Sequence, residues 1–226
     1  MLDDEGRLFW ERNAARYDRS MGLFGGPLPR TRVLVAEAVR GAARVLEIAC
    51  GTGLVSEAIA PVVGELLATD YAEAMVAKTR ERVGHLGNVR CEVRDLYALG
   101  QRDGSFDAVV ASNVLHLVPD LPGGLAAMRR VLRPGGRLVV PTYCHAQDAR
   151  SRLVSAALSL VSFPGQRRFD LDGLAEAVSG AGFVVVDKEL VPGVLPIGFV
   201  VARVPEGEVG APVMTEAGPG RGSASG

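Results

Sequence analysis

Short apolar runs alternate with stretches of helical periodicity along most of the chain. The runs are rich in β-branched and large apolar residues, as strands covered on both faces require. Strands are predicted over residues 45–48, 66–70, 89–95, 106–111 and 137–141. Helices are predicted over 30–40, 54–60, 72–83 and 121–132. Strict alternation of strand and helix indicates a doubly wound α/β sheet.

The last two apolar runs, over 183–190 and 195–204, break this alternation. Only Val191-Pro192-Gly193-Val194 joins them, and so short a link cannot make a parallel crossover. The pair must therefore be antiparallel. A helix before it, capped by Asp170 or Asp172, is predicted to end near Ser179. The predicted fold class is α/β, a Rossmann-like doubly wound sheet of seven strands, mostly parallel with an antiparallel last strand, and with helices on both faces.

Three segments lie outside this alternation. Residues 1–26 contain a charged stretch with helical spacing and then a Gly/Pro-rich break, which predicts an N-terminal helical lid. Residues 146–168 interrupt the main domain of residues 27–204 and predict an inserted lid segment, helical from Ala146 with one apolar face. Residues 205–226 are rich in Gly, Pro, Ser and Ala, and we expect a disordered tail there.

Composition narrows the classes of function. The chain has 226 residues and is 48% hydrophobic, which suits one domain with a full core. Its formal charge of -1 gives no basic field, so nucleic acid is not an expected partner. No apolar run reaches the roughly 18 residues that a membrane span needs. Three unpatterned cysteines and no secretory signal favour a cytoplasmic location, and no metal site is predicted.

A turn of small residues, Ala49-Cys50-Gly51-Thr52-Gly53, follows the first predicted strand. Small side chains let a ligand approach the backbone, and Gly51 and Gly53 permit dihedral angles that other residues avoid. In open α/β sheets, ligands bind outside the carboxyl ends of the strands. A lone Gly-x-Gly is as compatible with a simple turn, so the surrounding residues must decide between the two interpretations.

Acidic residues stand at or near the ends of the first three predicted strands: Glu47, Asp70 and Asp95. An acid after the second strand can accept both hydroxyls of a ribose. One after the third can receive an adenine amino group, and the first can hold an ammonium group directly or through water. Asp95 alone is more simply a helix cap. Three acids along one edge are harder to explain as caps and predict a nucleoside site.

At this point the sequence resembles the class I S-adenosylmethionine-dependent methyltransferases, over about residues 17–204. The matching motifs are residues 45–53, 69–71, 94–96, 106–107 and 132–136. The antiparallel last strand pair is also typical of that family. Ala15-Arg16-Tyr17-Asp18 and the glycine break after it look like the branch of ubiquinone and menaquinone biosynthesis methyltransferases and their small-molecule and phospholipid relatives.

The resemblance implies S-adenosyl-L-methionine as cofactor, S-adenosyl-L-homocysteine as product and a small-molecule or lipid-like acceptor. It also implies the cofactor-binding residues. These are Glu47 and the backbone of Ala49, Gly51 and Gly53 for the methionine moiety, Asp70 for the ribose, Tyr71 and Met75 for the adenine, Asp95 and Leu96 for the base edge, and Asn113 beneath the methionine end. Formation of a homodimer is compatible with the sequence.

Methyl transfer from a sulfonium requires mainly that the acceptor be aligned and water excluded. A base helps when the acceptor is a hydroxyl or an acidic carbon, and histidine is the usual choice. His116 follows the fourth predicted strand and His145 the fifth, so both can project over the cofactor. We predict that one of them is the base or orients the acceptor, with Tyr17 and Tyr143 lining the acceptor site. Capping or packing is the alternative for each histidine.

Two other functions stay open. Residues 51–56 nearly match the Gly-x-Gly-x-x-Gly/Ala fingerprint of NAD(P)-dependent oxidoreductases. Glu47 before the turn and the antiparallel strand pair argue against that class. A protein that keeps this fold and its cofactor without methylating anything is the other alternative.

Overall fold

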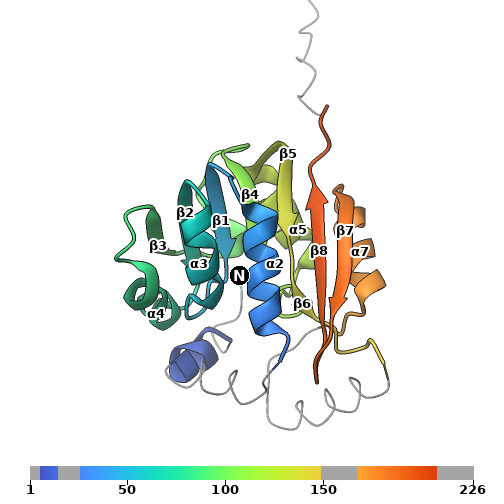
Figure 1. Ribbon diagram of the computed structural model, residues 1–226, viewed down its shortest axis with the longest axis horizontal. Helices are drawn as coiled ribbons and strands as arrows, with labels where there is room; N and C mark the ends of the chain where they lie inside the picture. The colour runs from blue at the N-terminus through green and yellow to red at the C-terminus, as the bar shows by residue number, and fades with distance from the viewer. Residues whose placement is uncertain (1–5, 15–25, 149–166, 208–226) are drawn as a thin grey trace, which may run out of the picture.

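The computed structural model describes residues 6–14, 26–148 and 167–207, and an eight-stranded sheet is the centre of this part (Figure 1). The strands are β1 (Arg44–Ile48), β2 (Glu65–Asp70), β3 (Val89–Val93), β4 (Phe106–Ala111), β5 (Leu132–Val139), β6 (Thr142–Tyr143), β7 (Val184–Val191) and β8 (Ile197–Arg203). Their order is β3-β2-β1-β4-β5-β8-β6, and β7 also pairs with β8. Strands β1 to β5 are parallel, whereas β8 is antiparallel to β5, β6 and β7. The predicted fold class is confirmed.

The sheet differs from the prediction in two places. The two-residue strand β6 adds an eighth strand to the predicted seven, and it continues along β8 after β5 has ended. Strand β5 begins at Leu132, not at residue 137, because the predicted turn takes part in strand pairing. There the Gly135 N–H donates to the Val204 carbonyl and the Val204 N–H donates to the Gly136 carbonyl, both at 3.0 Å.

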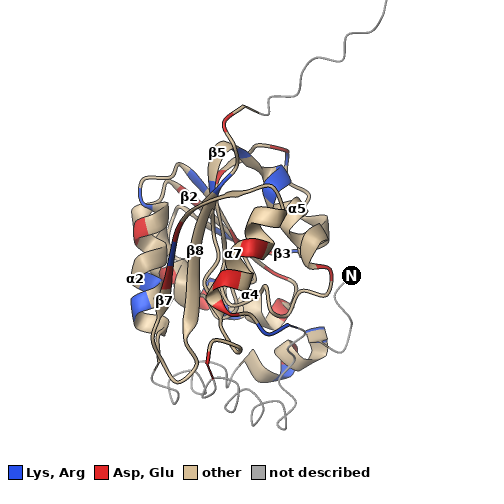
Figure 2. Ribbon diagram, turned by 90° about the vertical axis from the view of Figure 1, so that its right-hand side faces the viewer, with Lys and Arg blue, Asp and Glu red and all other residues tan. Residues whose placement is uncertain are grey.

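Helices cover both faces of the sheet (Figures 1 and 2). They are α2 (Leu28–Val39), α3 (Leu54–Ile59), α4 (Glu73–Val83), α5 (Leu121–Val131) and α7 (Leu171–Gly180), with short 3-10 helices η1 (Ala60–Val62) and η2 (Leu96–Ala98). Helices α2 and α3 share a core with one face of β1 and β4, while α5 and α7 share a core with the other. Helix α4 packs against α3, β2 and β3. The Asp170 carboxylate accepts the Gly173 N–H, so Asp170 caps α7.

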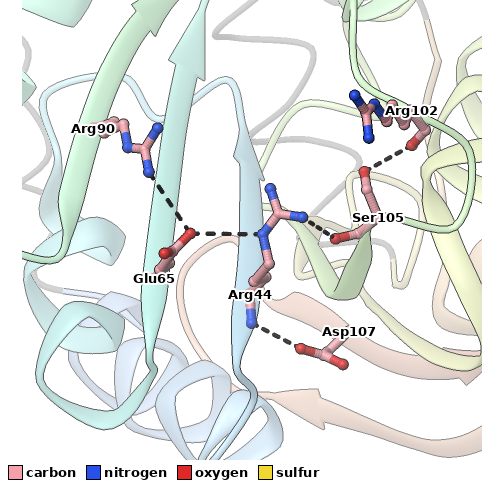
Figure 3. Close-up of polar contacts among 6 residues, drawn as sticks. All are labelled: Arg44, Glu65, Arg90, Arg102, Ser105 and Asp107. Atoms are coloured by element: carbon pink, nitrogen blue, oxygen red, sulfur yellow. Dashed lines mark hydrogen bonds and ion pairs between the residues drawn. The ribbon is translucent and has the colours of Figure 1, made fainter.

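Exposed polar contacts join the amino ends of β1, β2 and β4 (Figure 3). The Arg44 N–H donates to Asp107 at 2.7 Å, and its guanidinium donates to the Ser105 carbonyl and pairs with Glu65. Glu65 also pairs with Arg90 at 3.8 Å. Exposed pairs contribute at most about 1 kcal/mol each. These contacts fix strand ends at the edge opposite to the predicted site.

The predicted lid segments are described only in part. Residues 6–14 form a helix, whereas Tyr17 lies outside the described residues. Residues 145–148 form a turn and bend, so the helix predicted to begin at Ala146 does not begin there. Residues 149–166 and the tail over 208–226 also lie outside the described residues. None of the helices that the structure describes has the length and hydrophobicity of a membrane span. Homodimer formation stays a prediction.

Candidate functional site

The turn after β1 has the backbone conformation that its small residues allow. Ala49, Gly51 and Gly53 have φ angles of 54°, 57° and 83°. A Cβ on Gly53 would lie 3.1 Å from the Thr79 backbone, so only glycine lets α4 approach there. A Cβ on Gly51 would meet no atom of the described residues within 4 Å. The main chain is therefore open at Gly51, as a ligand lying on the backbone would require.

Asp70 ends β2 beside this turn and is 5% exposed. One carboxylate oxygen accepts the Gly51 N–H at 3.0 Å, and the other accepts the Ala72 N–H at 2.9 Å. Burial raises the pKa of Asp70 to about 6, against the lowering effect of these backbone bonds, and the nearby Glu11 charge raises it further. Asp70 is thus mostly ionised at neutral pH. A carboxylate has about four acceptor sites, so beside the backbone N–H groups of Gly51, Tyr71 and Ala72 it keeps capacity for a ribose hydroxyl.

Glu47 is 1% exposed and points toward α3, where the Ser56 hydroxyl donates to it at 2.5 Å. Burial raises the pKa of Glu47 to about 8, the Ser56 hydrogen bond lowers it in part, and the charge of Asp70 raises it. Glu47 therefore holds a proton for most of the time at pH 7. An ammonium group placed beside it would favour loss of that proton.

Asp95 lies two residues beyond the end of β3. It is held beside β2, since the preceding Arg94 N–H donates to the Asp70 carbonyl at 2.9 Å. Its own carboxylate accepts the Tyr97 N–H at 3.0 Å and caps η2, which is the alternative that the sequence left open. The Leu96 side chain is buried in the core. The three acids do follow neighbouring strands at one edge, but contacts of Asp95 and Leu96 with a base stay a prediction.

The other predicted cofactor residues lie around this edge. Tyr71 is half-buried, and Met75 packs against Ala72 and Ala14. Asn113 has a φ of 52°, and its N–H donates to the Pro141 carbonyl at 2.7 Å. The Asn113 Oδ1 is buried and accepts no hydrogen bond from the described residues. Such an oxygen is costly to leave without a donor, so its position suits a ligand that carries an ammonium group.

Two histidines and a tyrosine form a cluster of rings after β4 and β5. The ring centroids of His116 and His145 are 5.6 Å apart. The ring centroid of Tyr143 lies 6.4 Å from that of His116 and 6.2 Å from that of His145. Burial, and then the charge of His145, lowers the pKa of His116 to about 3. Burial also lowers the pKa of His145 and raises that of Tyr143 to about 12. The structure brings the histidines together as neutral rings at pH 7, while their catalytic role stays a prediction.

Two residues that hold this site in place were not found from the sequence. The Arg167 guanidinium donates to the carbonyls of Val118 and Pro119, and its N–H donates to the His116 carbonyl at 3.1 Å. Arg167 therefore fixes the loop that carries His116. Glu11, on the helix of residues 6–14, accepts two N–H groups at the start of α4. No motif or periodicity marks either contact, because both join segments far apart in the sequence.

A family model described as a methyltransferase domain matches residues 46–140, from β1 through β5. Residues 46–140 thus resemble a methyltransferase domain. It is 34% identical over 159 residues to the ubiquinone/menaquinone biosynthesis C-methyltransferase UbiE of Teredinibacter turnerae. That alignment covers 66% of this chain and 63% of the relative, less than two thirds of its length. The resemblance to S-adenosylmethionine-dependent methyltransferases, and with it the family's cofactor, is confirmed.

Solved structures share the fold of this chain. The N-methyltransferase NodS of Bradyrhizobium japonicum, in complex with S-adenosyl-L-homocysteine, has a TM-score of 0.70 and 20% identity over 90% of this chain and all (100%) of its own. The [4+2]-cyclase SpnF has a TM-score of 0.66 and 21% identity, covering 79% of this chain and 81% of its own. Identities this low establish a common fold and no common reaction.

Proposed function

We propose that this protein transfers the methyl group of S-adenosylmethionine to a small-molecule acceptor and releases S-adenosylhomocysteine. The observation that carries the proposal is the open main chain at Gly51 beside the buried, ionised Asp70, at the carboxyl edge of β1 and β2. Open α/β sheets bind nucleoside ligands at such an edge. Asp70 has acceptor capacity for the ribose, and the Asn113 oxygen needs the kind of donor that the methionine ammonium provides.

When bound, the cofactor supplies a methyl carbon that is already electrophilic. The protein must then orient the acceptor and exclude water. Support for this role of the ring cluster is that β4, which leads to His116, pairs directly with β1. His145 has a buried Nδ1 without a hydrogen-bond partner among the described residues. It can take a proton from the acceptor, whereas the very low pKa of His116 makes that residue the weaker base.

For the acceptor, we propose a quinol-like aromatic ring that is methylated on carbon. Support comes from the UbiE relative, whose name specifies C-methylation in quinone biosynthesis. It also comes from the rings of His116, Tyr143 and His145, because aromatic side chains pack well against a flat aromatic acceptor. Transfer of the acceptor hydroxyl proton to His145 would raise electron density on the neighbouring ring carbon, which would bond to the methyl carbon as the carbon–sulfur bond breaks. That ring carbon would then lose its own proton to solvent, and the acceptor oxygen would regain the proton from His145, which restores the aromatic quinol.

Two titrations and one assay test the proposal. Calorimetry should show binding of S-adenosylhomocysteine and none of NADH; heat with NADH alone would favour the oxidoreductase alternative. Incubation with methyl-labelled cofactor and a set of quinols should give a labelled product by mass spectrometry. The cyclase among the fold relatives makes this assay necessary, because cofactor binding without any labelled product would favour a non-methylating protein.

A further inference from the structure

Glu11 connects the helix of residues 6–14 to the start of α4. Its two carboxylate oxygens accept the N–H groups of Glu73 at 2.7 Å and Ala74 at 3.0 Å. The first N–H groups of a helix have no partner within the helix and carry partial positive charge. The N-cap residue of α4, Ala72, has no side-chain capping bond. Glu11 therefore caps α4 from 62 residues away in the sequence.

The same helix start is connected to Asp70, the acid proposed to bind the ribose. Asp70 accepts the Ala72 N–H, so Asp70 and Glu11 together bind three consecutive N–H groups. Trp10 and Ala14, on the same helix as Glu11, pack against Ala72 and Met75. In Figure 1 this dark blue helix lies below α4, at the end of the molecule where the parallel strands finish.

We propose that Glu11 is a positioning residue for the cofactor. Glu11 docks the helix of residues 6–14 on α4 and thereby fixes the turn from Asp70 to Ala72. This inference rests on the proposed function, because that turn would hold the ribose and the adenine. Docking of the helix of residues 6–14 and binding of the cofactor both depend on this turn. Each equilibrium must therefore strengthen the other by the same factor. Addition of S-adenosylhomocysteine should accordingly make the docked helix harder to release.

Trp10 gives a direct measurement of docking in the full chain. It is the only tryptophan, so its emission and its quenching by acrylamide report the position of this helix without any turnover. Glu11→Gln should shift the emission to the red and increase quenching. At pH 8 it should weaken S-adenosylhomocysteine binding by calorimetry on the order of tenfold, through loss of a charged cap. Glu73→Gln is the matched control, since it removes an acid at the same helix end and keeps the N–H that Glu11 binds.

A pH series separates positioning from general loss of structure. The charge of Asp70 raises the pKa of Glu47 from β1 and of Cys50 from the glycine turn, and Asp70 itself faces the charge of Glu11 from the docked helix. Burial is the main cause of the raised pKa of Asp70, and the charge of Glu11 adds to it. Glu11→Gln should therefore shift the acid-side loss of binding to lower pH, although binding at pH 8 is weaker. A purely structural defect would weaken binding without this shift.

The outcomes are distinct. If the wild-type protein gives no heat with S-adenosylhomocysteine, the proposed function fails and the inference about Glu11 fails with it. If the wild type binds, but Glu11→Gln keeps the wild-type affinity at pH 8, the wild-type pH profile and the wild-type Trp10 emission, then only the inference about Glu11 is overturned.

Discussion

Substitution of Gly51 by alanine separates a ligand contact from backbone strain. The φ of +57° at this position costs a non-glycine residue roughly 1–2 kcal/mol, which lowers the melting temperature of a domain of this size by about 2–8 °C. Because the new Cβ meets no described protein atom within 4 Å, no further loss of stability is expected. If the cofactor lies on this backbone, the Cβ occupies its place, and overpacking costs about 1–3 kcal/mol. Binding of S-adenosylhomocysteine should fall by about one to two orders of magnitude.

Gly41→Ala is the matched control for this experiment. Gly41 has a φ of +74° and equally open surroundings, but it precedes β1 at the opposite edge of the sheet. It should lose similar stability by differential scanning calorimetry and keep wild-type binding. Wild-type affinity in Gly51→Ala would refute the placement of the cofactor on this turn, and so would an equal loss of affinity in both variants.

Three further predictions concern the site. The pKa of Glu47 is raised from 4.5 to about 8, so between these pH values the folded state binds more protons than the unfolded state. The folded state therefore loses on the order of several kcal/mol of stability as pH rises from about 4.5 to 8. Glu47→Gln should therefore have a higher melting temperature than the wild type at pH 8 and the same melting temperature near pH 4.5. A difference in melting temperature that is the same at every pH would contradict the raised pKa of Glu47. Arg167→Lys keeps the positive charge but removes the guanidinium group that donates to the carbonyls of Val118 and Pro119. The kcat with a quinol acceptor should therefore fall about tenfold, while the affinity for S-adenosylhomocysteine stays unchanged. His145→Gln should lower kcat by about 10²–10⁴-fold and His116→Gln by much less, and the reverse order would make His116 the base.

Most of the fold could be predicted because it follows from local pattern. Strand β4 has the predicted bounds, and β1 and β2 each begin only one residue early, since buried parallel strands leave a continuous apolar run. The start of β5 was missed because Gly135 and Gly136, which signal a turn, pair with Val204, a residue distant from them in the sequence. Strand β6 has two residues, too few for any periodicity.

The candidate site was predictable to a different degree. The edge that carries Glu47 and Asp70 follows from topology, because parallel strands end together. The capping bond of Asp95 was one of two alternatives, since an acid after a strand can either cap a helix or contact a ligand. Glu11 and Arg167 contribute through single hydrogen-bonded contacts across long stretches of chain, and only the folded structure shows those.

The most direct test of the account is calorimetric titration of S-adenosylhomocysteine into the wild-type protein and into Asp70→Ala at pH 8, with the melting temperature of each protein measured alongside. We expect clear binding by the wild type and at least a hundredfold loss in the variant, because the buried carboxylate at the end of β2 would no longer receive the ribose hydroxyls. Absence of binding by the wild type, or equal affinity in a folded Asp70→Ala variant, would contradict the account.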